Sequence, residues 1–284
     1  MSLDDSTLLV LASISVSGLC SLVGLHLILR RQAMYADALS HSVLPGLVIA
    51  FLLSESLGPW PLLLGALGAG LFTSVLTQSL RDRAALREDT SLGIVFSGLF
   101  ALGVLMLGLF AGKVHLDASC VLFGELAFLP LEASVQVGGL EVPGPFALLL
   151  GTFAVVATIC LIFHRAMIAS AFHEEMARAM GIPVRFLHHL TLTLAAAAII
   201  ACFESVGAIL VIGLLVIPPS FGRLFSSSFR GVLSWAWGLG IFTSVVGVPL
   251  AFAWNTPISA MLVSVAFSSF AIAFTVKWIW ETRR

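Results

Sequence analysis

The stretch that decides the fold is YADALSHSVLPGLVIAFLL, residues 35–53. It begins with an acid and a histidine, Asp37 and His41, and then continues directly into an apolar run. The i,i+4 spacing places both side chains on one face of a helix. Ionisable groups within membrane-spanning helices are costly and usually functional. The stretch therefore predicts a membrane helix that carries a polar site.

The whole chain has the composition of an integral membrane protein. It is 59% hydrophobic and only 10% charged, with a mean hydropathy of +1.09, whereas soluble domains carry about 25% charged residues. The pattern predicts an all-α, polytopic membrane protein with about eight to nine transmembrane helices, forming a single domain over residues 1–284. The apolar segments are residues 8–29, 39–57, 61–80, 91–111, 145–163, 190–203, 206–218, 232–254 and 257–280.

Two of these segments, residues 190–203 and 206–218, are shorter than the roughly 20 residues that a bilayer requires. They predict a break around Glu204 and Ser205. Interrupted segments of this kind often mark a transport pathway.

The basic residues predict the orientation of the chain. If the first span runs from outside to inside, every lysine and arginine except Lys113 lies on the inner side. Such a bias follows the positive-inside rule, so we expect the N-terminus outside and the C-terminus inside. The inner basic residues are Arg30, Arg31, Arg81, Arg83, Arg87, Arg165, Arg178, Arg185, Arg223, Arg230, Lys277, Arg283 and Arg284.

Asp37 and His41 are the strongest candidate metal ligands. A carboxylate with an imidazole suits Mn(II), Fe(II) or Zn(II) rather than Cu(I), which prefers thiolates. Two ligands are too few for a closed structural site, and this favours transport because the ion must also leave. The alternative is structural: Asp37 caps a helix at the inner interface, and His41 hydrogen-bonds to a neighbouring helix.

Three further residues are weaker candidates. Glu204 lies at the predicted break, where it binds an ion or pairs with a backbone donor. His115 and Asp117, on the predicted outer loop, are candidates for guiding a metal inward. His26 is expected to be a packed helix residue, and His188 with His189 the solvated end of a loop.

Residues 165–189 form the largest predicted cytoplasmic segment. Residues 171–180 are good helix formers with acids early, and Gly181 provides a C-cap ahead of Pro183. The sequence therefore predicts a compact cytoplasmic helix that contacts a partner. A phosphate-binding loop is not recognisable: residues 108–114 have one residue too few between the glycines and lack the Ser or Thr that holds magnesium.

Four motifs in order resemble the membrane permease subunits of bacterial ABC importers for manganese, zinc and iron. They are DALSHSVLPG on the second apolar segment, LDASCVLFGELAF on the outer side, HEEMARAMGIPVRFLHHL on the inner side and SVGAILVIGLLVIPPSFGRLF late in the chain. The resemblance covers nearly the whole sequence. It departs at Glu204, where this family more often carries a neutral Gln.

The resemblance implies a type II ABC importer permease fold, related to the vitamin B12 and siderophore permeases, in the bacterial cytoplasmic membrane. It implies a second permease copy or a paralogous permease, a cytoplasmic ABC ATPase dimer that hydrolyses ATP, and an extracytoplasmic metal-binding protein. The chain itself would be no enzyme, would bind no nucleic acid and would hold no permanent cofactor, only the transported divalent metal. The metal-coordinating positions fall on Asp37 and His41. The ATPase-coupling positions fall on Phe172, Glu174, Glu175, Met180, Gly181 and Pro183.

The competing hypothesis is an ion-coupled secondary metal transporter in which Asp37 and Glu204 take up protons. Such carriers often show two related halves. The sequence has no obvious internal repeat, because Asp-x-x-x-His occurs in a single apolar segment.

Overall fold

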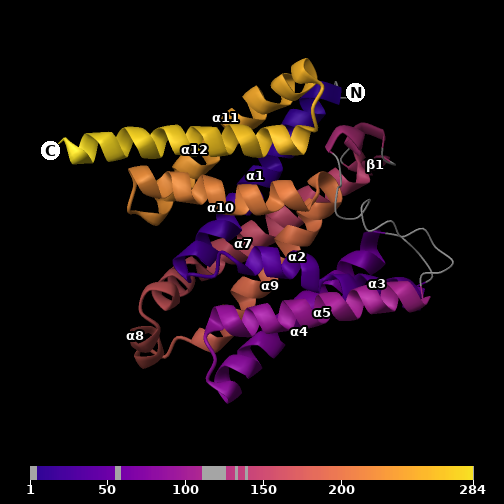
Figure 1. Cartoon of the computed structure of the whole chain (residues 1–284), viewed down its shortest axis with the longest axis vertical. Coiled ribbons are helices and arrows are strands. Elements are labelled where there is room, and N and C mark those ends of the chain that lie inside the picture. Colours follow the sequence, from indigo (N-terminus) through magenta and orange to yellow (C-terminus); the bar gives the residue numbers. More distant parts are fainter. Residues whose placement is uncertain (1–4, 55–58, 111–125, 132–133, 138–139, 284) are drawn as a thin grey trace.

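The structure, a computed structural model, describes residues 5–54, 59–110, 126–131, 134–137 and 140–283. Most of these residues are helical (Figure 1). In this described part, 8 helical segments are long and apolar enough to cross a membrane, and α10 contributes a shorter apolar one. The all-α polytopic fold is thus confirmed. The helices are α1 (Asp5–Leu29), α2 (Tyr35–Ser42), α3 (Leu44–Ser54), α4 (Pro59–Ala84), α5 (Glu88–Phe110), α7 (Gly144–Phe172), α8 (Glu174–Ala179), α9 (Val184–Val206), α10 (Ala208–Phe225), α11 (Phe229–Trp254) and α12 (Ile258–Thr282).

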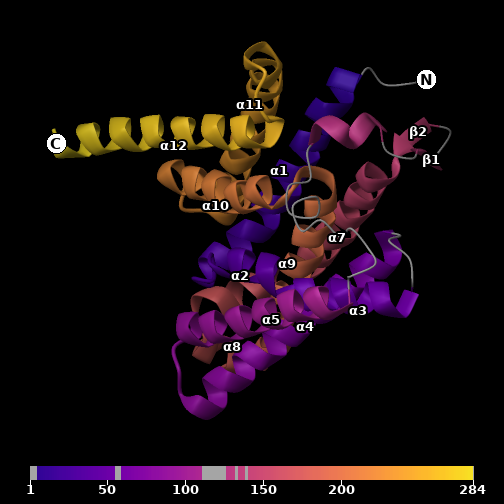
Figure 2. The ribbon, with the colours of Figure 1, turned by 45° about the vertical axis from the view of Figure 1, so that its right-hand side comes forward.

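The helices pack in two groups that share α9. In one group, α1 contacts α7, α9, α10 and α11, while α12 covers α10 and α11. In the other group, α2 to α5 pack together, and α4 lies against α9. Figures 1 and 2 show α4 and α5 at one edge of the molecule and α11 and α12 at the other. The start of α1 and the end of α12 lie on opposite sides (Figure 1), as nine predicted segments require.

Glycines allow the closest helix contacts. A Cβ atom on Gly24 of α1 would lie 1.9 Å from the backbone oxygen of Leu215 on α10. One on Gly46 of α3 would lie 2.3 Å from the backbone oxygen of Gly65 on α4. Small residues at such contacts let membrane helices approach closely, where packing rather than the hydrophobic effect drives association.

The break late in the chain differs from the sequence prediction. α9 continues through Glu204 and Ser205 and ends at Val206, and the chain turns at Gly207, which has a φ of 79°. Only glycine adopts this conformation without strain. The prediction of a short first segment was therefore wrong, because α9 has 23 residues, whereas the second is short as predicted, with Leu210–Phe225 as its apolar helix.

The connection between α5 and α7, predicted to lie on the outer side, contains three short elements among its described residues. A 3₁₀ helix (Leu126–Leu131) precedes an antiparallel hairpin of β1 (Ser134–Val137) and β2 (Leu140–Pro143). In this hairpin Val135 pairs with Val142. The predicted outer-side residues His115 and Asp117 lie outside the described residues.

Candidate metal site

One face of α2 fastens the helix to α4. Tyr35, Leu39 and Ser42 recur at helical spacing and are almost completely buried. The Tyr35 hydroxyl donates to the backbone oxygen of Gly70 at 3.4 Å, and burial raises the pKa of this phenol, which keeps it neutral. The Thr73 hydroxyl donates to Ser42 Oγ at 3.0 Å. Both ends of α2 are thereby held against α4, and this fixes the rotation of the helix.

Asp37 and His41 project from the opposite face of α2. Oδ1 of Asp37 and Nε2 of His41 lie 3.8 Å apart, and the two side chains are 45% and 38% exposed. The His41 ring packs edge-on against Phe100 of α5, with ring centroids 5.2 Å apart. Phe100 lies near the middle of the 22-residue candidate span of α5. His41 is thus level with the middle of one candidate span, and the pair lies within another, of which Asp37 is the first residue.

Several polar atoms around this pair have no ordinary helical partner. Nδ1 of His41 is buried without a hydrogen bond from any described residue. Pro45 has no N–H to donate to the backbone oxygen of His41, four residues earlier. The Ser40 hydroxyl does donate to the backbone oxygen of Asp37, at 2.6 Å. The backbone oxygen of His41 is approached instead by the Val43 N–H, and Nε2 rather than Nδ1 is the His41 nitrogen that faces Asp37.

The pair has the spacing to hold one metal ion. Bonds from a transition metal such as zinc to imidazole nitrogen and carboxylate oxygen are about 2.0–2.2 Å, so donors 3.8 Å apart can bind the same ion. Among the described residues, no three His, Cys, Asp or Glu side chains gather into a metal-binding group. Other ligands would have to be water, backbone oxygen or a second chain. The Glu204 side chain is not among the side chains that the structure describes.

The structure also gives the surroundings of Asp37 and of three histidines other than His41. The N-cap of α2 is Met34, without a side-chain cap bond, and Asp37 is the third residue of the helix, in its first turn. His26 is buried, and its Nδ1 lies 2.9 Å from the backbone oxygen of Leu22, as expected of a packed residue. His188 and His189 are not a solvated loop end, because both belong to α9 and are partly buried. This prediction failed because α9 begins earlier than its apolar run.

Residues 165–189, predicted as a cytoplasmic segment, include parts of two long helices. α7 runs on to Phe172 and α9 begins at Val184, so the segment between them is α8 and its flanks. The predicted helix over 171–180 is divided at His173, whose φ of −140° ends α7. Gly181 has a φ of 77° and closes α8, as predicted. Its N–H donates to the Arg178 oxygen at 3.0 Å, and Pro183 is the N-cap residue of α9.

Three large apolar side chains on α8 and its flanks are exposed, beside the exposed charged residues of the helix. Phe172, Met176 and Met180 are 60%, 63% and 68% exposed, whereas Ala177 is buried against the bundle. Met176 was missed in the sequence, although its i,i+4 spacing to Met180 was the available signal. Glu174 forms an ion pair with Arg178, and its neighbour Glu175 is exposed.

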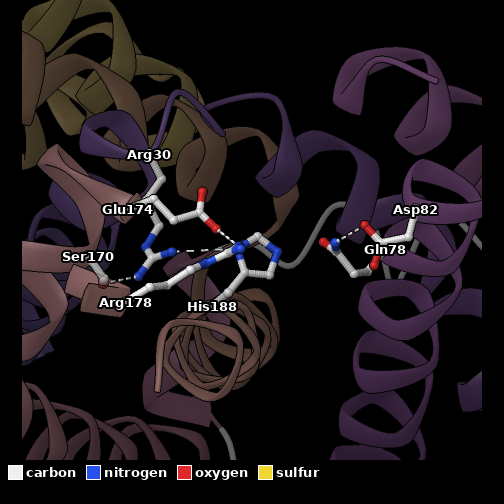
Figure 3. A network of polar contacts seen from close by, with 7 residues as sticks. All are labelled: Arg30, Gln78, Asp82, Ser170, Glu174, Arg178 and His188. Atoms are coloured by element: carbon white, nitrogen blue, oxygen red, sulfur yellow. Dashed lines mark hydrogen bonds and ion pairs between the residues drawn. The ribbon is translucent and has the colours of Figure 1, made fainter. Parts of the chain in front are cut away.

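A polar network beside α8 joins the ends of α1, α7 and α9 (Figure 3). The Arg30 guanidinium, at the end of α1, donates to Ser170 Oγ at 2.7 Å and lies 3.5 Å from His188 Nδ1. The next histidine, His189, lies 3.2 Å from the Ser74 hydroxyl of α4. Because α9 also contacts α2, one helix connects the surroundings of the metal pair to α8.

This bundle, with an ionisable pair within a candidate membrane span, is a polytopic membrane permease. The chain belongs to the ABC 3 transport family, whose model matches residues 7–277. The manganese transport system membrane protein MntD of Bacillus subtilis (strain 168) is 34% identical over 256 residues, covering 90% of this chain and 86% of the relative. The chelated iron transport system membrane protein YfeD of Yersinia pestis is 33% identical over 243 residues, covering 86% and 75%.

The fold is also found among solved structures. PsaBC from Streptococcus pneumoniae, solved in complex with Fab, matches with a TM-score of 0.77 and 27% sequence identity, over 94% of this chain and 89% of that chain. These comparisons confirm the family resemblance and the permease fold.

Proposed function

We propose that this chain is the membrane-spanning permease subunit of an ATP-driven importer, and that it moves a divalent transition metal into the cytoplasm. The observation that carries the proposal is the half-exposed pair of Asp37 and His41 within a candidate membrane span. Exposure of a carboxylate to hydrocarbon would be costly. The pair must therefore face a water-filled pathway or a second permease chain.

The geometry supports transient binding. Two side-chain ligands on one helix, with no hydrogen bond to His41 Nδ1 from the residues that the structure describes, would hold an ion weakly enough for release. The donor set fits Mn(II), Fe(II) or Zn(II), and the names of relatives include manganese and chelated iron. A second copy, or a paralogous permease, would face this pair across the pathway and complete the coordination shell.

Energy and delivery would come from partners. A separate ATPase dimer would dock on α8, whose exposed methionines Met176 and Met180 suit an apolar pocket. An extracytoplasmic metal-binding protein would deliver the ion on the opposite side. With the inner basic residues as guide, the N-terminus lies outside and the C-terminus inside the bacterial cytoplasmic membrane.

The test is metal uptake in cells that lack their own manganese, zinc and iron importers. The chain is expressed with its genomic neighbours as wild type, as Asp37→Asn and as His41→Ala. We expect uptake of one metal by the wild type and uptake at background in both variants, because each removes half of the ligand pair. Asp5→Asn, the same change at the exposed start of α1, should transport normally.

Full uptake by a stably expressed Asp37→Asn protein would refute the ligand assignment. Uptake by the chain in ATP-free liposomes under a proton gradient would refute the ATP-driven mechanism.

A further inference from the structure

A cavity of about 510 Å³ lies at one end of the bundle, where α1, α10 and α12 approach their ends and α11 begins. Leu25 and Leu29 of α1, Phe172 of α7, and Phe229 and Val232 of α11 form its apolar wall. Neither Asp37 and His41 nor any residue of α8 lines it.

The charged groups of the cavity are two cations. Arg223 and Lys277 line it, and no acidic side chain does so among the described residues. The Lys277 ammonium donates to the Leu224 oxygen at 2.7 Å and lies 3.8 Å from the Glu281 carboxylate. An ammonium has three donors, which leaves one for a ligand. Arg223 makes no ion pair or side-chain hydrogen bond within the described part of the chain.

Two neighbouring features favour an anion at the same place. Ser226 and Ser227 bring hydroxyl groups to the lining. The N-terminus of the 26-residue helix α11 opens beside them, with Ser228 accepting from the Gly231 N–H at 3.2 Å. Helix N-termini carry partial positive charge and stabilise anions.

An aromatic rim surrounds this end of the bundle. Phe225, which lines the cavity, stacks on Trp235 with ring centroids 4.7 Å apart. Trp235 is 48% exposed, and Trp278, next to Lys277, is 61% exposed. Exposed tryptophans gather at the level of lipid headgroups. In the orientation proposed above, this is the cytoplasmic leaflet.

We propose that this cavity binds an anionic phospholipid, with its phosphate between Arg223 and Lys277 and an acyl chain along the apolar wall. Basic pockets between transmembrane helices on the cytoplasmic side bind such headgroups. Free phosphate would meet the cations but would leave the apolar wall in contact with water, which is unfavourable. The inference rests on the proposed orientation and on the permease fold, and it does not require metal transport.

The experiment measures lipid retained by the purified full chain, together with the subunits that copurify. The protein is equilibrated with nanodiscs of equal phosphatidylglycerol and phosphatidylcholine, extracted in mild detergent and analysed by native mass spectrometry. We expect Arg223→Gln to lower retained phosphatidylglycerol about fivefold, as loss of one cation near an anionic lipid predicts. Arg223→Lys should keep it. Arg230→Gln removes the same charge from the first turn of α11, outside the cavity lining, and should have no effect.

Equal loss in the Arg223→Gln and Arg230→Gln proteins would overturn the proposal, because the effect would then be one of surface charge. Equal retention of phosphatidylcholine would overturn it too. Displacement of the lipid by millimolar inorganic phosphate would assign the cations to free phosphate instead. Lipid retention is measured on purified protein, and metal uptake is measured in cells. A negative lipid result would therefore leave the proposed metal transport standing, and a negative uptake result would leave the proposed lipid site standing.

Discussion

The metal pair on α2 and the surface of α8 have opposite chemistry in opposite surroundings. Asp37 and His41 are polar side chains within a candidate membrane span, and no described residue hydrogen-bonds to His41 Nδ1. Met176 and Met180 are apolar side chains at the solvent-facing end of the bundle, each more than 60% exposed. Each region therefore exposes side chains that its surroundings disfavour. In the proposed function, an ion would complete the pair on α2 and a protein surface would cover α8.

The comparison also shows how each region is held. α2 is fastened to α4 through Tyr35 and Ser42, so its ligands keep a fixed orientation before the ion arrives. α8 is only 6 residues long, too short to be a stable helix by itself. It is held by the buried Ala177 and by the Gly181 turn. A rigid ligand site and a small, anchored docking element would suit a permease that is coupled to its ATPase through α8.

The largest expected effect separates these two regions. Met176→Asp should weaken ATPase binding on the order of 30-fold, as loss of an interface hot spot of about 2 kcal/mol predicts, and should leave metal affinity unchanged. Asp37→Asn should abolish metal binding and leave ATPase binding unchanged. Copurification of the ATPase and calorimetric metal titration measure the two properties on each variant.

Met34→Asp is the matched control, because Met34 is 65% exposed and lies on the same side of the bundle, just before α2. It should bind the ATPase as the wild type does. If Met176→Asp and Met34→Asp weaken binding equally, α8 is not the docking element.

The apolar segments of this fold could be read from the sequence because lipid constrains composition strongly. Every segment that crosses hydrocarbon must be helical and apolar, and the nine predicted segments correspond to the helical spans of the structure. Helix ends were harder to predict. α7 runs 9 residues beyond its predicted end at Phe163, to Phe172, because a helix continues past the apolar region until a residue such as His173 breaks it. The end of α9 is set by Gly207 and not by Glu204, because the positive φ of Gly207 breaks the helix.

The metal pair could be predicted because its signal is local: an acid and a histidine spaced i,i+4 inside an apolar segment. The side chains that surround the pair could not be predicted. The contacts of His41 with Phe96 and Phe100 join segments about 55 to 59 residues apart, and single-sequence periodicity carries no information on such pairings.

A smaller effect is expected from a change at Gly46, which contacts neither Asp37 nor His41. A Cβ on Gly46 would lie 2.3 Å from the Gly65 oxygen and 2.6 Å from Ala69 Cβ. Gly46→Ala should therefore separate α3 from α4 and destabilise the bundle by about 1–3 kcal/mol. Because α3 follows α2 directly through Val43, the shift should also weaken metal binding.

Gly68→Ala in α4 is the matched change, because no described atom lies within 4 Å of the added Cβ. It should be neutral or slightly stabilising. Thermal unfolding in detergent measures both variants. Equal melting temperatures would show that α3 and α4 do not depend on this close contact.

The smallest effect tests the turn that closes α8. Gly181 has a φ of 77° with open space around it, so Gly181→Ala should cost about 1 kcal/mol through backbone strain and not through a clash. Its N–H and that of Ile182 donate to the Arg178 and Ala177 oxygens, both at 3.0 Å, and these amides should exchange with solvent about fivefold faster in the variant. Hydrogen exchange by mass spectrometry measures this, with Gly181→Asn as the substitution that tolerates a left-handed backbone. Unchanged exchange in the alanine protein would mean that α8 is held by Ala177 and not by its C-terminal turn, and the anchoring of the docking element would then lie in packing alone.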